Sequence, residues 1–310
     1  RFRIRLFRIR LKLHTRFCER TLDRGYSEGF KTQRVGGTLG IRLLVKKWGG
    51  FTAIGGEKVN IKCELYNDHF QNYKRYNIPK AQLVIADIPY NLGNKAYASN
   101  PEWYVDGDLS KGESDKAGKA FFDTDNDFRI AEFMHFCSKM LIKEPKERGK
   151  APAMIVFCSH QQQTMVIEYG KRYGFNHYIP LVFIKNQSPQ VLKANMRIVG
   201  ATEYALVLYR EKLPKFNNHG RMIFNWFKWE LDSSYPKIHP TQKPVPVLKN
   251  LIEIFTDYGD VVIDPCAGSG STLRAATELN RHAYGFEIKK DMYNKAKEKM
   301  LKTIPTSLIL

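Results

Sequence analysis

The sequence of 310 residues predicts an α/β protein, with a mostly parallel sheet covered by helices on both faces. Short apolar runs of strand type alternate along the chain with segments in which apolar residues recur at helical spacing. Three of the apolar runs end in an acid, at Asp87, Asp264 and Glu287. In an open α/β sheet, ligands bind beyond the carboxyl ends of the strands, which is where these acids are expected.

The individual elements follow from apolar composition and periodicity. The clearest helix has apolar residues at i, i+3, i+4 and i+7, from Leu248 to Phe255, and ends near Gly259. Strands are predicted at 58–68, 81–87, 152–159, 178–185, 203–210, 260–264 and 282–288. The remaining helices are predicted at about 133–141, 161–173, 271–280 and 291–301.

The composition narrows the class of partner. The chain has 50 Lys and Arg against 31 Asp and Glu, and a net charge of +19 suits nucleic acid or an acidic membrane surface. The five cysteines are scattered without a CxxC pair, which argues against zinc and against a disulfide framework and fits a reducing cytosol. No apolar run reaches the roughly 18 residues that a membrane span needs.

The chain is predicted to divide into a basic N-terminal extension, 1–55, and a globular domain, 56–310. Residues 1–50 contain fourteen Lys or Arg and three acids, a net charge of +11. The opening RFRIRLFRIRLKL alternates basic and apolar residues, the pattern of a two-faced strand. Three interpretations stay open: an arm on DNA, a transit peptide, or a poorly ordered extension without a role in the chemistry.

The turn after Asp264 is rich in small residues. Gly268 and Gly270 let the backbone approach a ligand closely, because no Cβ intervenes. The turn is not a P-loop, since no Lys follows, and Leu273 replaces the last glycine of G-x-G-x-x-G. Glu287, 23 residues after Asp264, stands where an acid accepts ribose hydroxyls in nucleoside-binding folds. The pattern favours a nucleoside-containing cofactor, and the alternative is a turn that only packs a helix onto the sheet.

The stretch Asp87-Ile88-Pro89-Tyr90 directly follows a predicted strand. It resembles the (Asp/Asn/Ser)-Pro-Pro-(Tyr/Phe) motif of amino-group methyltransferases. Over about residues 60–300 the chain resembles the β class of DNA amino-methyltransferases, through this motif together with FIKN, EYALVLY, HPTQKP (239–244), DPCAGSGST (264–272) and YGFEI. That class places the catalytic motif before the cofactor motif, a circular permutation of the usual order. The similar ribosomal-RNA adenine methylases have the cofactor motif first, so the order argues against them.

The resemblance implies one Rossmann-like methyltransferase domain with S-adenosylmethionine as cofactor. Asp87 and the carbonyl of Ile88 would accept the two N–H groups of the target amino group, which makes its nitrogen more nucleophilic. Pro89 would stiffen the turn, and Tyr90 would stack on the base for about 1–3 kcal/mol. Ile88 replaces the family's Pro, but activity is expected to survive because only the backbone carbonyl is used. The alternatives are a strand-end cap for Asp87 and a core aromatic for Tyr90.

Asp at the first position of the motif is typical of N6-adenine enzymes, so we expect methylation of adenine in double-stranded DNA after base flipping. N4-cytosine methylation, RNA methylation and a non-catalytic DNA-binding protein of the same fold remain alternatives. Retention of Asp87, Pro89, Tyr90 and Glu287 argues against the last of these. A cognate restriction nuclease is a further possible partner, and no metal is required.

The resemblance also implies a cofactor site. Glu287 would bind the ribose, and Thr241 and Lys243 would lie near the methionine carboxylate. Asp68 would contact the adenine of the cofactor, with a simple turn residue as the alternative. The backbone around the glycine turn would line the pocket, with Asp264, Cys266, Gly268 and Gly270; the Cys266 thiol is expected to pack and not to act as a nucleophile.

Two further segments have predicted roles. Residues 185–249 contain eleven Lys or Arg and four acids, and the aromatic-rich stretch 211–237 within them is the candidate target-recognition region. The alternative is that MIFNWFKW is a packed strand. Residues 91–127 contain four Lys and eight acids, which is unsuitable for phosphates, so this stretch is predicted to be a mobile lid.

Overall fold

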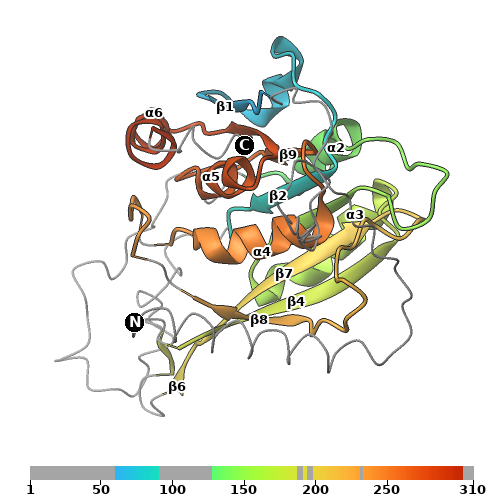
Figure 1. The fold of residues 1–310 in the computed structure, drawn as a ribbon. Helices are drawn as coiled ribbons and strands as arrows, with labels where there is room; N and C mark the ends of the chain where they lie inside the picture. The colour runs from blue at the N-terminus through green and yellow to red at the C-terminus, as the bar shows by residue number, and fades with distance from the viewer. Residues whose placement is uncertain are drawn as a thin grey trace, which may run out of the picture. The chain divides into compact units, whose positions relative to one another are not determined.

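The computed structural model describes residues 60–90, 128–186, 191–193, 198–230, 233–239 and 241–302. An eight-stranded sheet with the order β1-β10-β9-β2-β3-β7-β4-β8 forms its centre (Figure 1). β7 is antiparallel to its two neighbours, and the other neighbouring pairs are parallel, which confirms the predicted mixed, mostly parallel sheet. The strands are β1 (Cys63–Tyr66), β2 (Leu83–Asp87), β3 (Ala153–Phe157), β4 (His177–Lys185), β7 (Thr202–Tyr209), β8 (Trp226–Trp229), β9 (Val261–Asp264) and β10 (His282–Phe286).

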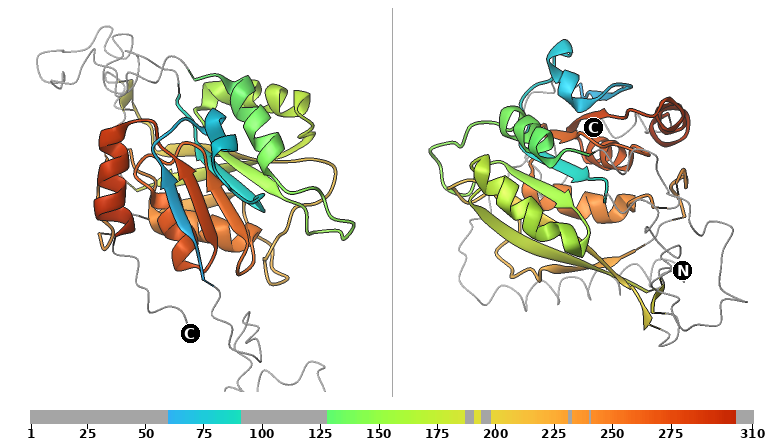
Figure 2. Two further views of the ribbon diagram at one scale, coloured as in Figure 1. Left: turned by 90° about the horizontal axis from the view of Figure 1, so that it is seen from above. Right: turned by 180° about the vertical axis from the view of Figure 1, so that it is seen from behind.

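Helices cover both faces of this sheet (Figure 2). One face packs against α4 (Val245–Phe255), α5 (Ser271–Glu278) and α6 (Lys290–Lys295), which continues as the π-helical η7 (Ala296–Leu301). The other face packs against the 3-10 helix η1 (Phe70–Arg75), α2 (Ile130–Met140) and α3 (Gln163–Arg172), the last preceded by η6 (His160–Gln162). The two faces explain the continuous apolar runs, because a strand buried on both sides has no polar face.

Side-chain alternation assigns each strand residue to a face. In β2, Leu83 and Ile85 belong to the core under α4 and α5, whereas Val84 and Ala86 belong to the core under α2 and α3. Because the period along a strand is two, Asp87 shares the α4 face with Leu83 and Ile85. The alternation of side chains between the two faces therefore decides which of them can meet at the carboxyl edge of the sheet.

The circular permutation is visible in the strand order. β9 and β10 come from the last part of the chain, yet they lie between β1 and β2. From β9 the sheet continues to β10, and from β2 it continues in the opposite direction to β3, so β9 and β2 flank a topological switch point. Ligands of open α/β sheets bind outside the carboxyl ends of the strands at such a point.

Some local features differ from the prediction. β1 ends at Tyr66, two residues before Asp68, and Val191–Lys193 pairs with Ile198–Val199 in a small β5–β6 ribbon that the pattern did not predict. Within 211–237 the chain forms β8, an edge strand parallel to β4. The predicted extension 1–55 and the predicted lid 91–127 both lie wholly outside the described residues. None of the described helices has the length and apolar character needed to cross a membrane.

Candidate active site

Three charged side chains converge on the α4 face at the carboxyl edge. Asp87 ends β2, Glu203 lies near the start of antiparallel β7, and Lys185 ends β4. Each lies two residues from an apolar residue of the core under α4, namely Ile85, Ala205 and Phe183, respectively. Strand alternation therefore directs the three toward the same side of the sheet.

Lys243 connects these charges. It lies two residues before the start of α4, which covers this face. Its Nζ is 2.6 Å from Asp87 Oδ2 and 4.0 Å from Glu203 Oε2, and its side chain is only 10% exposed. Lys185 forms an ion pair with the other oxygen of Glu203, Oε1. The result is a row of alternating charges, with Lys185, Glu203, Lys243 and Asp87 in order.

Burial and the neighbouring charges set the protonation of this row. Burial raises the pKa of Asp87 above its usual value, and the ammonium of Lys243 limits the rise. Burial opposes the charge of Lys243, but the carboxylates of Asp87 and Glu203 raise its pKa. Burial would also raise the pKa of Glu203, and the two lysines beside it lower it instead. The row is therefore held as a set of ion pairs.

One atom of this row has no hydrogen-bond partner among the residues that the structure describes. Asp87 Oδ1 is buried and accepts no hydrogen bond within the described part of the chain, although the Asp87 side chain as a whole is 34% exposed. The described residues bond to the carboxylate of Asp87 only through Lys243, so it does not cap its strand end there. A buried acceptor without a donor is unfavourable, which makes Oδ1 a site for a donor from a ligand.

The turn after Asp87 is fixed against two neighbouring strands. Ile88 N donates to Phe157 O at 3.2 Å, and Gln162 Nε2 donates to Pro89 O at 3.0 Å. Tyr90 is half-buried and not in the core, and its hydroxyl donates to Glu203 Oε2 at 3.1 Å. The motif is thus held rigidly beside the charged row, while the side chain of Ile88 fills the core under α2.

The glycine turn follows β9, next to β2 in the sheet. Asp264 is buried, and its Oδ1 accepts from Cys266 N at 3.0 Å. Burial raises the pKa of Asp264 to about 7, although bonds from Thr272 and Cys266 act in the opposite direction. Gly270 has φ 79° and Gly268 has φ 51°, a region in which a Cβ is strained, and α5 begins directly after Gly270. Glycine is required here for the conformation of the turn.

Glu287 follows β10 and is tied to this turn. Its Oε1 accepts from Lys289 N at 2.7 Å, and its carboxylate also accepts the backbone N–H of Gly268. Burial raises the pKa of Glu287, and these two bonds oppose the rise. The structure therefore brings Asp264, Gly268 and Glu287, which the sequence predicts for the cofactor, together at adjacent strand ends.

Asp68 has a different environment. Its Oδ1 accepts from His69 N and Asn72 Nδ2, each at 2.7 Å, and its Oδ2 accepts from Tyr76 hydroxyl at 2.9 Å. These bonds, led by that from Asn72, lower its pKa. Both oxygens serve the η1 turn, which favours the alternative of a turn residue. Thr241 Oγ1 lies 2.9 Å from the ring nitrogen Nδ1 of His239.

The sequence reasoning missed Glu203, Lys185 and Gln162 as site residues. Glu203 and Lys185 were inside the motifs EYALVLY and FIKN but were given no role. The signal that could have found them is a charged residue at the end of an otherwise apolar strand, an even number of positions from the buried residues of one face. Gln162 belongs to a helix start and had no such signal.

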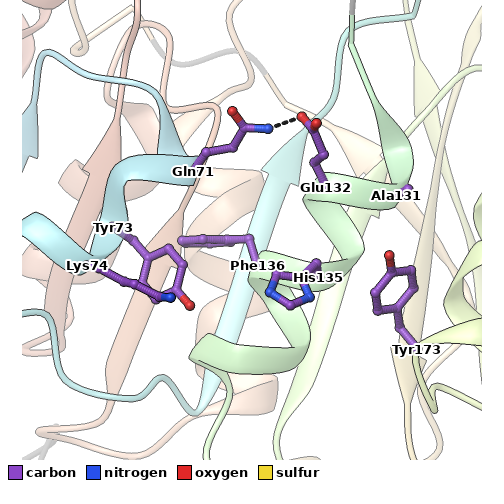
Figure 3. Close-up of a pocket in the computed structure, with 8 residues that line it drawn as sticks. All are labelled: Gln71, Tyr73, Lys74, Ala131, Glu132, His135, Phe136 and Tyr173. Atoms are coloured by element: carbon purple, nitrogen blue, oxygen red, sulfur yellow. Dashed lines mark hydrogen bonds between the residues drawn. The ribbon is translucent and has the colours of Figure 1, made fainter.

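A hollow of about 390 Å³ lies elsewhere on the molecule (Figure 3). It is formed by η1 and α2, which cover the face opposite Asp87. Its lining contains none of the strand-end acids, so we do not assign the chemistry to it. The lining residues are Gln71, Tyr73, Lys74, Ala131, Glu132, His135, Phe136 and Tyr173.

Comparison with known proteins gives a family match. The model of the N6/N4 methyltransferase family, described as DNA methylase, matches residues 81–298. The type II methyltransferase M.HindIII of Haemophilus influenzae is 42% identical over 77 residues, which are 25% of this chain and 24% of that protein. The DNA adenine methyltransferase YhdJ of Escherichia coli is 24% identical over 264 residues, 76% of this chain and 81% of that protein.

The solved structures include a similar fold. The crystal structure of the M1.HpyAVI–SAM complex has a TM-score of 0.53 at 20% sequence identity and covers 76% of this chain and 98% of its own. At this identity the likeness shows a shared fold.

Proposed function

The chain belongs to the DNA methylase family, and from this premise we propose that it transfers a methyl group to the N6 amino group of adenine in double-stranded DNA. The observation that carries the proposal is the buried Oδ1 of Asp87, which has no hydrogen-bond donor in the described part of the chain. This acceptor lies at the end of β2, directly beside the strand that leads into the glycine turn. A base amino group placed there would supply the missing donor.

The methyl donor is S-adenosylmethionine, which supplies an electrophilic methyl group on a positively charged sulfur. The residues present fit this cofactor. The buried carboxylate of Asp264 and the half-buried carboxylate of Glu287 suit a ligand with positive charge and ribose hydroxyls, and the Asp264–Gly270 turn offers backbone without obstructing side chains. We assign the ribose to Glu287 and the lining of the pocket to the turn, including Cys266. Thr241 is assigned to the methionine carboxylate.

The proposed chemistry depends on two acceptors. Asp87 Oδ1 and the carbonyl oxygen of Ile88 accept the two N–H groups of the target and concentrate its lone pair on nitrogen. As the new C–N bond forms and the bond from the methyl carbon to sulfur breaks, positive charge passes from the sulfur to that nitrogen and is stabilised there by the Asp87 carboxylate. Because burial raises the pKa of Asp87, it is also suited to accept the proton that the methylated amino group then loses.

Tyr90 is assigned to the flipped base. Its hydroxyl bond to Glu203 fixes the ring in one orientation, which suits a stacking platform. Stacking of a base on an aromatic ring contributes about 1–3 kcal/mol, enough to offset part of the cost of unstacking it from the duplex.

The DNA surface is assigned to 211–237. In β8, Phe227 and Trp229 pack against Phe183, whereas Trp226 and Lys228 are exposed. Phe224 is 74% exposed and stacks on Trp226 with ring centroids 6.0 Å apart. The alternative of a packed strand therefore holds for one side of this segment. The other side presents exposed aromatic and basic residues, which supports a role in DNA binding.

The choice of adenine rests on Asp at the first position of the motif and on the similarity to YhdJ, which is named a DNA adenine methyltransferase. The family model spans N6 and N4 enzymes, so cytosine is the second candidate. The likeness to type II M.HindIII supports a cognate nuclease as a possible partner.

The test is to identify the modified nucleoside. Purified protein is incubated with isotope-labelled S-adenosylmethionine and unmethylated duplex DNA of mixed sequence, with RNA of the same sequence in parallel. Digestion and mass spectrometry should give labelled N6-methyldeoxyadenosine from the DNA alone. Label in N4-methyldeoxycytidine, or only in the RNA, would contradict the proposal.

A further inference from the structure

We propose that Lys243 is a positioning residue of the methyl-transfer step. Together with Glu203, Lys243 fixes the Asp87 carboxylate and the Tyr90 ring. Lys243 is then not a ligand of the methionine part of the cofactor. This inference rests on the proposed function, since it concerns the same site. It differs from the role that the motif HPTQKP implied for Lys243.

The first argument concerns the two oxygens of the Asp87 carboxylate, which have different environments. Lys243 Nζ holds Oδ2 at 2.6 Å, and Oδ1 is buried and accepts no hydrogen bond from the described residues. A carboxylate fixed at one oxygen cannot rotate freely about its Cβ–Cγ bond. Lys243 therefore determines where the free acceptor lies relative to the target nitrogen.

The second argument is that Glu203 links this pair to the base platform. Glu203 Oε2 accepts the Tyr90 hydroxyl at 3.1 Å and lies 4.0 Å from Lys243 Nζ. Its other oxygen is occupied by Lys185. One carboxylate thus fixes the stacking ring and the lysine that orients the acceptor, so the two groups that meet the base are set together.

The third argument is the confinement of the ammonium. Lys243 Nζ lies 5.4 Å from the ring centroid of Phe157 and 5.8 Å from those of Tyr90 and Trp229. Three aromatic rings and two carboxylates surround one cation, which is favourable when water is excluded. A lysine held in this way is engaged by the catalytic turn and has its charge already compensated.

The charges around Asp87 determine what loss of Lys243 would do. Among the described residues, Lys243 forms the ion pair with the Asp87 carboxylate, and Lys185 has a smaller electrostatic effect on it. An opposite charge at this distance lowers the pKa of a carboxyl group by about 1–3 units. The groups of the described residues that face Asp87 from the packed elements are Lys243, Lys185, Glu203, Asp264, Tyr90, Cys158 and Cys266.

The experiment compares Lys243→Met and Lys243→Arg with the wild type. Lys249→Met is the matched control, because Lys249 lies six residues farther along the chain, on α4, and loses an ion pair with Glu278 outside the site. Three quantities are measured: the single-turnover rate of DNA methylation against pH, S-adenosylmethionine affinity by calorimetry, and the ¹³C titration of the Asp87 carboxyl, assigned with Asp87→Asn.

For Lys243→Met we expect the Asp87 titration and the acid limb of the rate to move up by about one pH unit or more. The rate below that limb should fall about tenfold at saturating cofactor and DNA, with cofactor affinity changed by less than about twofold. Lys243→Arg should keep the acid limb near its wild-type position, and Lys249→Met should leave all three readouts unchanged.

An unmoved Asp87 titration, or a loss of cofactor affinity that accounts for the whole loss of rate, would overturn the role of Lys243. A wild-type protein that methylates no DNA would instead overturn the proposed function. The carboxyl titration needs no substrate, so it would still decide whether Lys243 controls Asp87.

Discussion

Replacement of Asp264 by Asn tests the electrostatics of the glycine turn after β9. Asp264 has a pKa of about 7 in the folded protein, against about 3.9 in an unfolded chain. Between these values the folded state binds more protons, so the contribution of this group to the free energy of unfolding is fully present below about pH 4 and is lost by about pH 7. The slope is about 1.4 kcal/mol per pH unit, and the whole window amounts to roughly 4 kcal/mol.

The assay is urea unfolding of the wild type and Asp264→Asn at pH 5, 6, 7 and 8 without cofactor. Asn cannot titrate. The free energy of unfolding of the wild type minus that of the variant should therefore fall by about 1.4 kcal/mol per pH unit from pH 5 and level off above pH 7. Asp68→Asn is the control. The pKa of Asp68 is lowered, so it stays ionised in this range and its difference should be flat. A flat difference for Asp264→Asn would refute the assigned burial of charge.

Three other changes test the assigned roles. Glu287→Ala should weaken S-adenosylmethionine binding by about 1–3 kcal/mol in calorimetry, because ribose hydroxyls lose a charged acceptor, and unchanged affinity would exclude Glu287 from the site. Tyr90→Ala should weaken binding of DNA with an unpaired target base by about 1–3 kcal/mol while Tyr90→Phe loses less, and equal losses would contradict stacking. Deletion of residues 1–50 should lower the slope of log DNA affinity against log salt and leave the methylated sequence unchanged; a different methylated sequence would make this segment part of the recognition surface.

The positions of the strand-end acids could be predicted from the sequence because they depend only on the neighbouring residues in the chain. Asp87 and Asp264 each end an apolar run, and Glu287 directly follows one, so their place at the carboxyl edge followed from the α/β pattern. The adjacency of β9 and β2 is a property of strand order, which no local pattern contains. Only the permuted order of motifs pointed to it, and the strand order agrees.

The contacts of Lys243 show where sequence reasoning stops. Its partner Asp87 lies 156 residues earlier in the chain, and their 2.6 Å contact depends on how α4 packs over β2. Glu203 reaches the same cluster because β7 runs antiparallel and places its start at the carboxyl edge. The orientation of one strand therefore decides whether this charge joins the site, and the sequence of EYALVLY does not reveal that orientation.

The most direct test of the account is methyl transfer by Asp87→Ala, with cofactor binding measured on the same preparation. The account predicts wild-type affinity for S-adenosylmethionine, since Asp87 is not among the residues assigned to the cofactor, and a single-turnover rate on DNA reduced by about 10²-fold or more. A variant that binds the cofactor and transfers methyl groups at the wild-type rate would contradict the assignment of Asp87 and, with it, the proposed mechanism.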